Sequence, residues 1–348
     1  MSPVFSQGVL FVVVLILVLF VPVYFILHRR GRKQAAPPRT RGEKARRALV
    51  YVLRLLGFAL LALLLVTGGT TVFVSYQGAQ EDMRPAPSAV EVPPDLPFPV
   101  EEVAFPGGDG LTLRGWYVPP QNGATVILLH GYGGNRTAMI WHAAVLTEAG
   151  YGVLLYDERA SGESDGDHRS YGWEDPSDVA GAIDFLDGLP GTDPARVGIL
   201  GCSIGGQIAL QGAAYSPQIA AVWADGPAGI TARDLTIPGN WVYPFTMSSN
   251  YLVDWFTARA LDRDVPPAMI DIIGTIEPRP VLLVAGGTEK PLLGSEALHV
   301  AGLAEHAGPH TELWIIPEAT HCDGPALRPE EYAARMVAFF DAALGIAR

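Results

Sequence analysis

The residues with the clearest chemical potential are a serine and two glycines in the run GCSIG at positions 201–205. An apolar stretch, 197–200, comes before this run, and a stretch of small and apolar residues, 205–214, follows it. A serine on a tight turn between a strand and a helix is exposed for attack, and the turn leaves room only for glycine beside it. We therefore predict that Ser203 is a nucleophile for acyl transfer.

A serine nucleophile needs a base that takes its proton and an acid that orients the base. His321 lies in the loop after an apolar strand at 311–317, and we predict that it is the base. Glu289 follows the preceding apolar strand, where such an acid is expected, and it is the predicted acid. Asp225, at the end of the strand after the nucleophile's helix, and Glu296 remain the alternatives.

A glycine-rich loop, HGYGGN at positions 130–135, follows an earlier apolar strand. Glycines let backbone N–H groups face a reacting carbonyl. We predict that the amides of Tyr132 and Ile204 form an oxyanion hole, which stabilises the charge that develops on the carbonyl oxygen. His130 is interpreted as a residue that braces this loop.

These residues are positioned by strands and helices that alternate from residue 101 onward. The predicted strands are residues 102–106, 111–119, 125–130, 152–157, 197–201, 220–224, 281–285 and 312–317. The predicted helices are residues 137–149, 175–186, 205–214, 295–307 and 329–344. Continuous apolar strands separated by helices indicate an α/β fold with a mostly parallel sheet that helices cover on both faces. Residues 227–277 break the alternation and are rich in aromatics and prolines, which predicts an inserted cap.

The N-terminal quarter differs from the rest of the chain. Residues 8–27 carry no charge, and at 1.5 Å per residue such a run spans a bilayer core of about 30 Å. A second apolar run covers 55–74, and a basic loop, 28–47, separates the two. A cleaved signal peptide would have a basic start, a shorter apolar run and a small-residue cleavage site. We therefore predict a two-helix transmembrane hairpin over 1–76.

Charge is distributed just as unevenly. Ten Lys and Arg residues and one acid precede residue 77, so the remainder holds 14 basic and 35 acidic residues and a net charge of −21. So acidic a body repels phosphate backbones, which argues against nucleic acid as a partner. The basic loop between two apolar runs is expected on the cytoplasmic side, with everything after residue 76 on the other side of the membrane. Residues 77–100 contain six prolines and are predicted to form an extended linker.

Residues 101–348 resemble the α/β-hydrolase superfamily, especially its serine aminopeptidase-like and abhydrolase branch. The similarity rests on the HGYGGN loop, the stretch YDERASGESDG, the GCSIGG turn, the strand EPRPVLLVAGG and the final THC, all in family order. The resemblance implies the chain order Ser, acid, His, and a bracing role for Asp157 and Arg159 after the fourth strand. Ala160 stands where a glycine is common, and Glu289 where most relatives have Asp.

The two cysteines lie beside the predicted nucleophile and base, since Cys202 precedes Ser203 and Cys322 follows His321. The arrangement is similar to the C-S…H-C pattern of tannases and feruloyl esterases, in which a disulfide joins the two loops. This resemblance implies a Cys202–Cys322 disulfide, in keeping with a domain in an oxidising compartment. The alternative is a pair of buried free thiols.

Together these features predict a membrane-anchored carboxylic ester hydrolase that uses no metal or organic cofactor. The expected partners are the membrane and a small-molecule or lipid ester. A serine peptidase of the aminopeptidase-like kind is one alternative, and it would need a fixed anion to hold a substrate amine. A catalytically silent, membrane-tethered binding protein is the other.

Overall fold

The computed structural model describes residues 40–236, 239, 242–290 and 294–347. The chain divides into two compact units, Met1–Gly78 and Ala79–Arg348, and each is described by itself. The first apolar run, residues 8–27, lies outside the described residues, so the two-helix hairpin stays a prediction.

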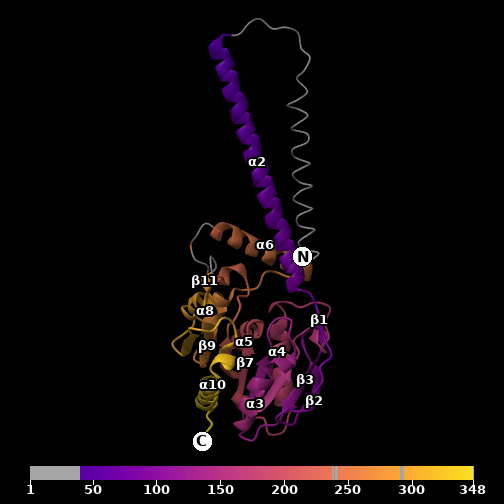
Figure 1. Cartoon of the computed structure of the whole chain (residues 1–348). Coiled ribbons are helices and arrows are strands. Elements are labelled where there is room, and N and C mark those ends of the chain that lie inside the picture. The colour runs from indigo at the N-terminus through magenta and orange to yellow at the C-terminus, as the bar shows by residue number, and fades with distance from the viewer. Residues whose placement is uncertain (1–39, 237–238, 240–241, 291–293, 348) are drawn as a thin grey trace. The chain divides into compact units, whose positions relative to one another are not determined.

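An eight-stranded sheet forms the centre of the second unit (Figure 1), in the order β12-β9-β8-β7-β4-β5-β3-β2. The strands are β2 Glu101–Pro106, β3 Thr112–Val118, β4 Thr125–Leu129, β5 Gly152–Tyr156, β7 Val197–Cys202, β8 Ile219–Asp225, β9 Val281–Gly286 and β12 Thr311–Ile316. Strand β3 pairs antiparallel with β2 and with β5, and all the other pairs are parallel. Every parallel strand that was predicted is present, and β2 and β3, near the first two predicted strands, form an antiparallel hairpin.

Helices cover both faces of this sheet, each over its own apolar cluster. One face packs against α4 Asp175–Asp187, α5 Ile204–Tyr215 and α8 Glu296–Ala304, and the other against α3 Ile140–Glu148 and α10 Pro329–Leu344. Strands β4, β5 and β9 are buried along their whole length. Two-sided burial explains why their sequences read as continuous apolar runs and not as alternating ones.

Residues 227–277, the cap segment, leave the sheet between β8 and β9. They form helix α6 Tyr243–Leu261, helix α7 Met269–Ile272 and two short 3₁₀ turns, η4 Ala232–Asp234 and η5 Ile273–Ile276. The carboxylate of Asp234 ties the segment together, because it accepts hydrogen bonds from the amides of Ile230, Thr231 and Ile270 at 2.8–3.0 Å. The segment is thus a structured insertion with helices of its own.

Three buried ion pairs hold the loop that follows β5. Asp157, fully buried, accepts hydrogen bonds from the amide of Arg136 at 2.8 Å and from its guanidinium at 2.6 Å. Arg159 binds Asp178 at 2.7 Å and Glu174 at 2.6 Å. These contacts agree with the bracing role implied for Asp157 and Arg159. Ala160, where a glycine is common, has a positive φ of 54°, which explains why glycine suits this position.

The proline-rich stretch 77–100 is not the free linker that its composition predicts. Strand β1 Ala86–Pro87 pairs in parallel with β6 Ser161–Gly162, and the side chains of Val90 and Phe98 are buried. The second unit accordingly begins at Ala79 and not at residue 101. Proline favours extended backbone, but extended backbone can also add to a sheet edge, and composition does not distinguish the two outcomes.

The described part of the first unit, from residue 40, is formed by the long helix α2 Arg41–Asp82, of 42 residues, whose last turn belongs to the second unit. It begins inside the predicted basic loop and continues past the predicted end at residue 76. Its most apolar stretch has a mean hydropathy of 2.6 and is only 6% buried, so its apolar side chains face outward. Within the described part of the chain, α2 is the one helix long and apolar enough to cross a membrane.

Candidate active site

Ser203 lies on a sharp turn between β7 and α5, with a φ of 59° and a ψ of −121°. A Cβ atom on Gly201 would collide with the backbone of Gly205. A Cβ atom on Gly205 would come within 2.5 Å of the carbonyl oxygens of Leu129 and His130. The flanking glycines are therefore required by backbone packing, and the turn holds Ser203 in a conformation that is costly for a residue with a side chain.

His321 lies in the loop after β12, and its Nε2 atom is 2.9 Å from the hydroxyl oxygen of Ser203. Asp323 fixes this loop by accepting hydrogen bonds from the amide and the hydroxyl of Thr320, both at 2.9 Å. The structure thus brings together the predicted nucleophile and the predicted base, although 118 positions separate them in the chain.

The carboxylate that meets His321 belongs to Glu296, which binds the Nδ1 atom of the ring. Glu296 is the first residue of α8, and its other oxygen accepts a hydrogen bond of 2.7 Å from the amide of Gly286, at the end of β9. Its side chain is only 9% exposed. The carboxylate is therefore held at both oxygens, with one bound to the sheet edge and the other to the imidazole.

The structure does not place Glu289, the predicted acid, at the histidine. Glu289 is exposed on a small hairpin in which β10 Glu289–Lys290 pairs with β11 Gly294–Ser295. The chain makes this excursion directly after β9 and returns to the sheet edge only where α8 begins. Glu296, which the sequence left as an alternative, then reaches back to His321. A glutamate at the start of a helix has the length for this reach.

Asp225, the other alternative, lies beneath the serine and not on the histidine ring. Its carboxylate is 3% exposed and accepts a hydrogen bond of 2.8 Å from the hydroxyl of Tyr332, which in turn accepts one of 2.8 Å from the Trp223 indole. Burial raises the pKa of Asp225 to about 7, against the lowering effect of the Tyr332 hydrogen bond, and the charge of Glu296 raises it further. The Asp225 backbone carbonyl also accepts the Ser203 amide at 2.8 Å.

Gly226 is a site residue that sequence reasoning missed. It has a φ of +54°, and a Cβ atom there would lie 2.9 Å from the Glu296 carboxylate and 3.0 Å from Nδ1 of His321. A side chain at this position would therefore separate acid from base. The signal was present in the sequence as a glycine directly after a candidate acid at a strand end.

Cys202 and Cys322 lie at disulfide distance, with their Cα atoms 6.1 Å apart across a sequence separation of 120 residues. This confirms the pairing that the C-S…H-C resemblance implied. The bond joins the residue before Ser203 to the residue after His321. It therefore holds the turn of the nucleophile and the loop of the histidine to one another.

The glycine-rich loop 130–135 faces the serine from the end of β4. A Cβ atom on Gly131 would lie 3.6 Å from the Cβ of Ser203. Among the described residues, no hydrogen bond acceptor is paired with the amide of Tyr132 or of Ile204. His130 braces the loop as predicted, since its Nδ1 meets the carbonyl of Gly131 at 2.8 Å and its Nε2 accepts the amide of Glu158 at 3.1 Å. Burial lowers the pKa of His130, which keeps the ring neutral.

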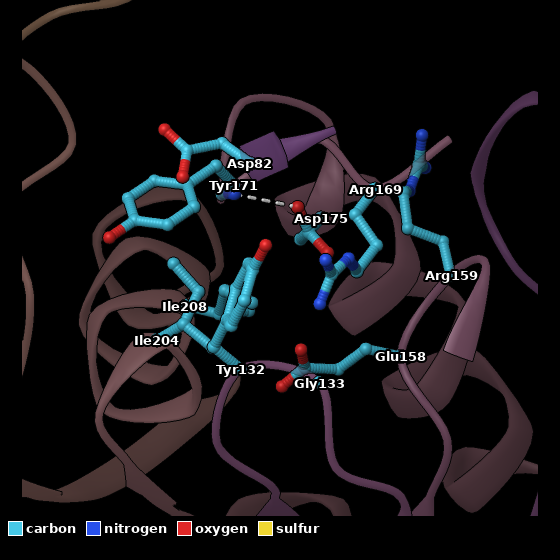
Figure 2. A pocket seen from close by; sticks show the side chains of 11 residues that line it. Asp82, Tyr132, Gly133, Glu158, Arg159, Arg169, Tyr171, Asp175, Ile204 and Ile208 are labelled. Atoms are coloured by element: carbon cyan, nitrogen blue, oxygen red, sulfur yellow. Dashed lines mark hydrogen bonds between the residues drawn. The ribbon is translucent and has the colours of Figure 1, made fainter. Parts of the chain in front are cut away.

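A small hollow adjoins this loop, and a larger one lies next to the small one. The smaller one, of about 10 Å³, is shown in Figure 2, where the ring of Tyr132 lies between Ile204 and the guanidinium of Arg169. The larger one, of about 210 Å³, lies between the cap segment, the loop before α4, the end of α2 and α8. Its lining residues are Asp82, Tyr171, Trp173, Ala228, Gly229, Ile230, Thr231, Ala232, Leu235, Asn250, Val253, Asp254, Thr257 and His299. Asp82 and Tyr171 line both hollows, so the larger one begins where the smaller one ends.

Within the described ranges, no group of three or more His, Cys, Asp or Glu side chains is arranged to hold a metal ion. The polar groups that converge on Ser203 are the imidazole of His321 and the backbone of two loops. Such an arrangement can accept a proton from the hydroxyl and can donate hydrogen bonds to an oxygen that becomes negative.

Comparison with known proteins gives one consistent family. A sequence profile of the alpha/beta hydrolase family matches residues 126–335. The uncharacterized protein YfhR of Salmonella typhimurium is 29% identical over 262 residues, which cover 71% of this chain and 84% of that one. The uncharacterized protein Rv2307c of Mycobacterium tuberculosis is 30% identical over 253 residues, or 69% of this chain and 80% of the relative.

Solved structures agree with this result. The esterase Pf2001 of Pyrococcus furiosus superposes with a TM-score of 0.58 at 26% identity, and the match covers 75% of this chain and 100% of that structure. The profile covers more than half of the 348 residues, and it includes both the serine turn and the histidine loop. The chain therefore belongs to the alpha/beta hydrolase family.

Proposed function

We propose that the protein is a membrane-anchored serine hydrolase that cleaves carboxylic esters through Ser203. Two contacts of the His321 ring carry this proposal. Its Nε2 atom is 2.9 Å from the Ser203 hydroxyl oxygen, and its Nδ1 atom binds the Glu296 carboxylate. A base within hydrogen-bond reach of a nucleophile, itself oriented by a carboxylate, is the arrangement that acyl transfer requires.

The reaction proceeds in two steps that use the same groups. As the Ser203 oxygen bonds to the acyl carbon, His321 takes its proton and the carbonyl electron pair moves onto oxygen. The amides of Tyr132 and Ile204 stabilise that oxyanion. The intermediate then expels the alcohol, which receives the proton from His321. Water repeats the sequence on the acyl-enzyme, so that a carboxylic acid leaves and Ser203 regains its proton. Glu296 keeps the imidazole in the correct tautomer and stabilises its cation.

The larger hollow is the proposed substrate site. Ala228, in its lining, donates its amide to the carbonyl oxygen of Ser203 at 3.4 Å, so the lining begins beside the nucleophile. Much of the wall is apolar or aromatic, including Trp173, Ile230 and Val253. A volume of about 210 Å³ suits a small acyl or alcohol group, or the end of a lipid chain. The esterase Pf2001, whose fold this chain shares, supports the ester assignment.

A peptidase is the second candidate, because the same hollow contains two carboxylates. Asp82 and Asp254 both line it, and no Lys or Arg is among its lining residues. Burial raises the pKa of Asp254 to about 6, against the lowering effect of the hydrogen bond from the Ala232 amide, and nearby Asp234 raises it further. An ammonium group bound beside a buried carboxylate would offset the cost of burying that charge. This is the fixed anion that an aminopeptidase-like site needs.

We also infer that α2 anchors the protein in a membrane and that the catalytic unit lies outside the cytoplasm. The inference is supported by the apolar, outward-facing surface of α2, the basic residues before and at its start, and the Cys202–Cys322 disulfide, since disulfides persist in oxidising compartments. A reporter fused after Arg348 should be active only outside the cytoplasm. A reporter active only inside it would reverse this topology.

The decisive test is labelling by a fluorophosphonate followed by a comparison of substrates. The full-length protein should be labelled, and the Ser203→Ala variant should not. A p-nitrophenyl ester and the matched aminoacyl p-nitroanilide then separate the two candidates. Faster ester cleavage supports the esterase, and preference for the free-amine anilide, lost in Asp254→Asn, supports the peptidase. A folded protein that is neither labelled nor active on these substrates would overturn both and leave a binding protein.

A further inference from the structure

We propose that residues 79–88, which include the last turn of α2 and strand β1, position the oxyanion loop, residues 130–135, for catalysis. We call them the junction segment. The proposal rests on the proposed function, because it assigns a role to the amide of Tyr132 as an oxyanion donor. By this proposal the junction segment belongs to the active site, although its amino-acid composition predicts only an extended linker.

The first contact is made by the Tyr132 side chain. Its hydroxyl donates a hydrogen bond of 2.6 Å to the carbonyl oxygen of Glu81, in the last turn of α2. This bond ties the ring of Tyr132 to the junction segment, while the amide of the same residue is the proposed oxyanion donor. The hydroxyl that binds Glu81 and the proposed oxyanion donor therefore belong to the same residue.

Arg169 completes this contact from the other side of the ring. Its guanidinium carbon lies 3.8 Å from the centre of the Tyr132 ring, and its Nη2 atom lies 3.4 Å from the Glu81 carbonyl. Arg169 is 9% exposed, and its Nε and Nη1 atoms are buried without a hydrogen bond in the described structure. Its backbone amide donates to the carbonyl of Met83 at 3.0 Å. The arginine is thus packed against Tyr132 (Figure 2). Its side chain and its backbone amide both contact the junction segment.

The far end of the same loop is held in the same way. Ser88 accepts a hydrogen bond of 3.0 Å from the side chain of Asn135, and its amide donates to the carbonyl of Gly162 at 2.9 Å. Asn135 in turn caps the 3₁₀ turn that follows the loop, by accepting the amide of Thr137 at 3.0 Å. The junction segment therefore touches the oxyanion loop at both Tyr132 and Asn135.

These contacts hold the loop that carries the proposed oxyanion donor, and we therefore assign them a positioning role. The Tyr132 side chain is 42% exposed, so little burial fixes its ring, and the hydrogen bond and the stacked guanidinium do so instead. An oxyanion donor is effective only at the right place, and loss of one donor costs about 10²–10³ in kcat. A loop that loses one of several fixing contacts should lose part of that factor, about tenfold. Asp82, in the same turn, lines both hollows, so this segment also forms a wall of the substrate site.

The test uses the full-length protein in detergent micelles or nanodiscs. Tyr132→Phe removes only the hydroxyl bound to Glu81, and it should lower kcat about tenfold with KM within about twofold, because ground-state binding does not use the oxyanion amide. The rate of inactivation by a fluorophosphonate should fall by a similar factor. Tyr117→Phe is the matched control, since it removes a hydroxyl that contacts Thr192 at 3.1 Å, outside the site.

A second variant tests the same contact from the other partner. Gln80→Pro distorts the last turn of α2 and displaces the Glu81 carbonyl, while Gln80→Ala, at the same exposed position, leaves the helix intact. Gln80→Pro should reduce kcat as Tyr132→Phe does, and the double variant should be no slower than the slower single one. Unchanged kcat in Tyr132→Phe, or fully multiplicative losses in the double variant, would overturn the proposal. Labelling of Ser203 would stand in either case, so the proposed function is tested separately.

Discussion

Two segments of the candidate active site are held in position by different kinds of contact. The turn at 201–205 is fixed locally, because Gly201 and Gly205 pack against backbone atoms that would collide with any side chain. The acid segment, residues 286–290 and 294–296, is fixed by tertiary structure, because the pairing of β10 with β11 leaves Glu289 exposed and α8 places Glu296 at the sheet edge. The proposed nucleophile is therefore positioned by its own neighbours in sequence, and the proposed acid by the point at which the chain returns to the sheet edge.

The comparison predicts that changes at the serine turn have the largest effect. Ser203→Ala should reduce the kcat of ester hydrolysis by about a millionfold, and His321→Ala by a similar factor, because either loss disables the whole relay. Initial rates per mole of protein, with circular dichroism to show that the fold is retained, are the measurement. An Ser203→Ala protein with ordinary turnover would show that the local packing of this turn serves another purpose.

The acid segment should give the next largest effect, at one glutamate and not at the other. Glu296→Gln should lower kcat by about 10³–10⁴-fold, because a side-chain amide can present its NH₂ group to Nδ1 and favour the wrong tautomer of His321. Glu289→Gln, seven positions away on the exposed hairpin, is the matched control and should stay within about twofold of the parent. The reverse pattern would return the acid role to Glu289 and would mean that the hairpin folds inward during the reaction.

The disulfide links the serine turn to the histidine loop. Closing a loop of 120 residues stabilises the folded state by up to about 4–5 kcal/mol in the chain-entropy model. Cys202→Ala and Cys322→Ala should each lower the Tm. The double variant should be no less stable than the less stable single one, because the same bond is lost. Thermal unfolding of the non-reduced proteins measures this, and a fully additive double variant would show that the cysteines act separately.

The same two segments show which parts of the fold and of the candidate site could be predicted from the sequence. Ser203, His321 and the sheet strands were predictable, because glycine spacing and apolar runs record packing between neighbours in the chain. Glu296 remained one of several options, because nothing local marks the hairpin that displaces Glu289. The docking of residues 79–88 was not predicted at all, since proline content indicates extended backbone without indicating what that backbone lies against. Gly226 was visible in the sequence, but its purpose depends on Glu296 and His321, which arrive from elsewhere.

A change at Asp225 should have the smallest effect on ester hydrolysis. Its backbone carbonyl accepts the Ser203 amide, and the charge of Glu296 acts on its carboxylate. Its pKa in the folded protein, about 7, is above the value of about 3.9 of a free aspartate. The folded state therefore binds this proton more tightly than the unfolded state does. The stability that follows from it is complete below pH 4 and is lost as the pH rises toward 7.

Asp225→Asn keeps an acceptor for the Tyr332 hydroxyl and removes the charge, so it should not show this loss. Between pH 5 and pH 8, the free energy of unfolding of the variant relative to the parent should rise by about 2–3 kcal/mol. Urea unfolding at the two pH values measures it, and a pH-independent difference would contradict the buried charge. Ester hydrolysis should change by less than about threefold, because Glu296 and not Asp225 meets His321. A loss as large as that expected for Glu296→Gln would instead make Asp225, at the end of β8, the acid.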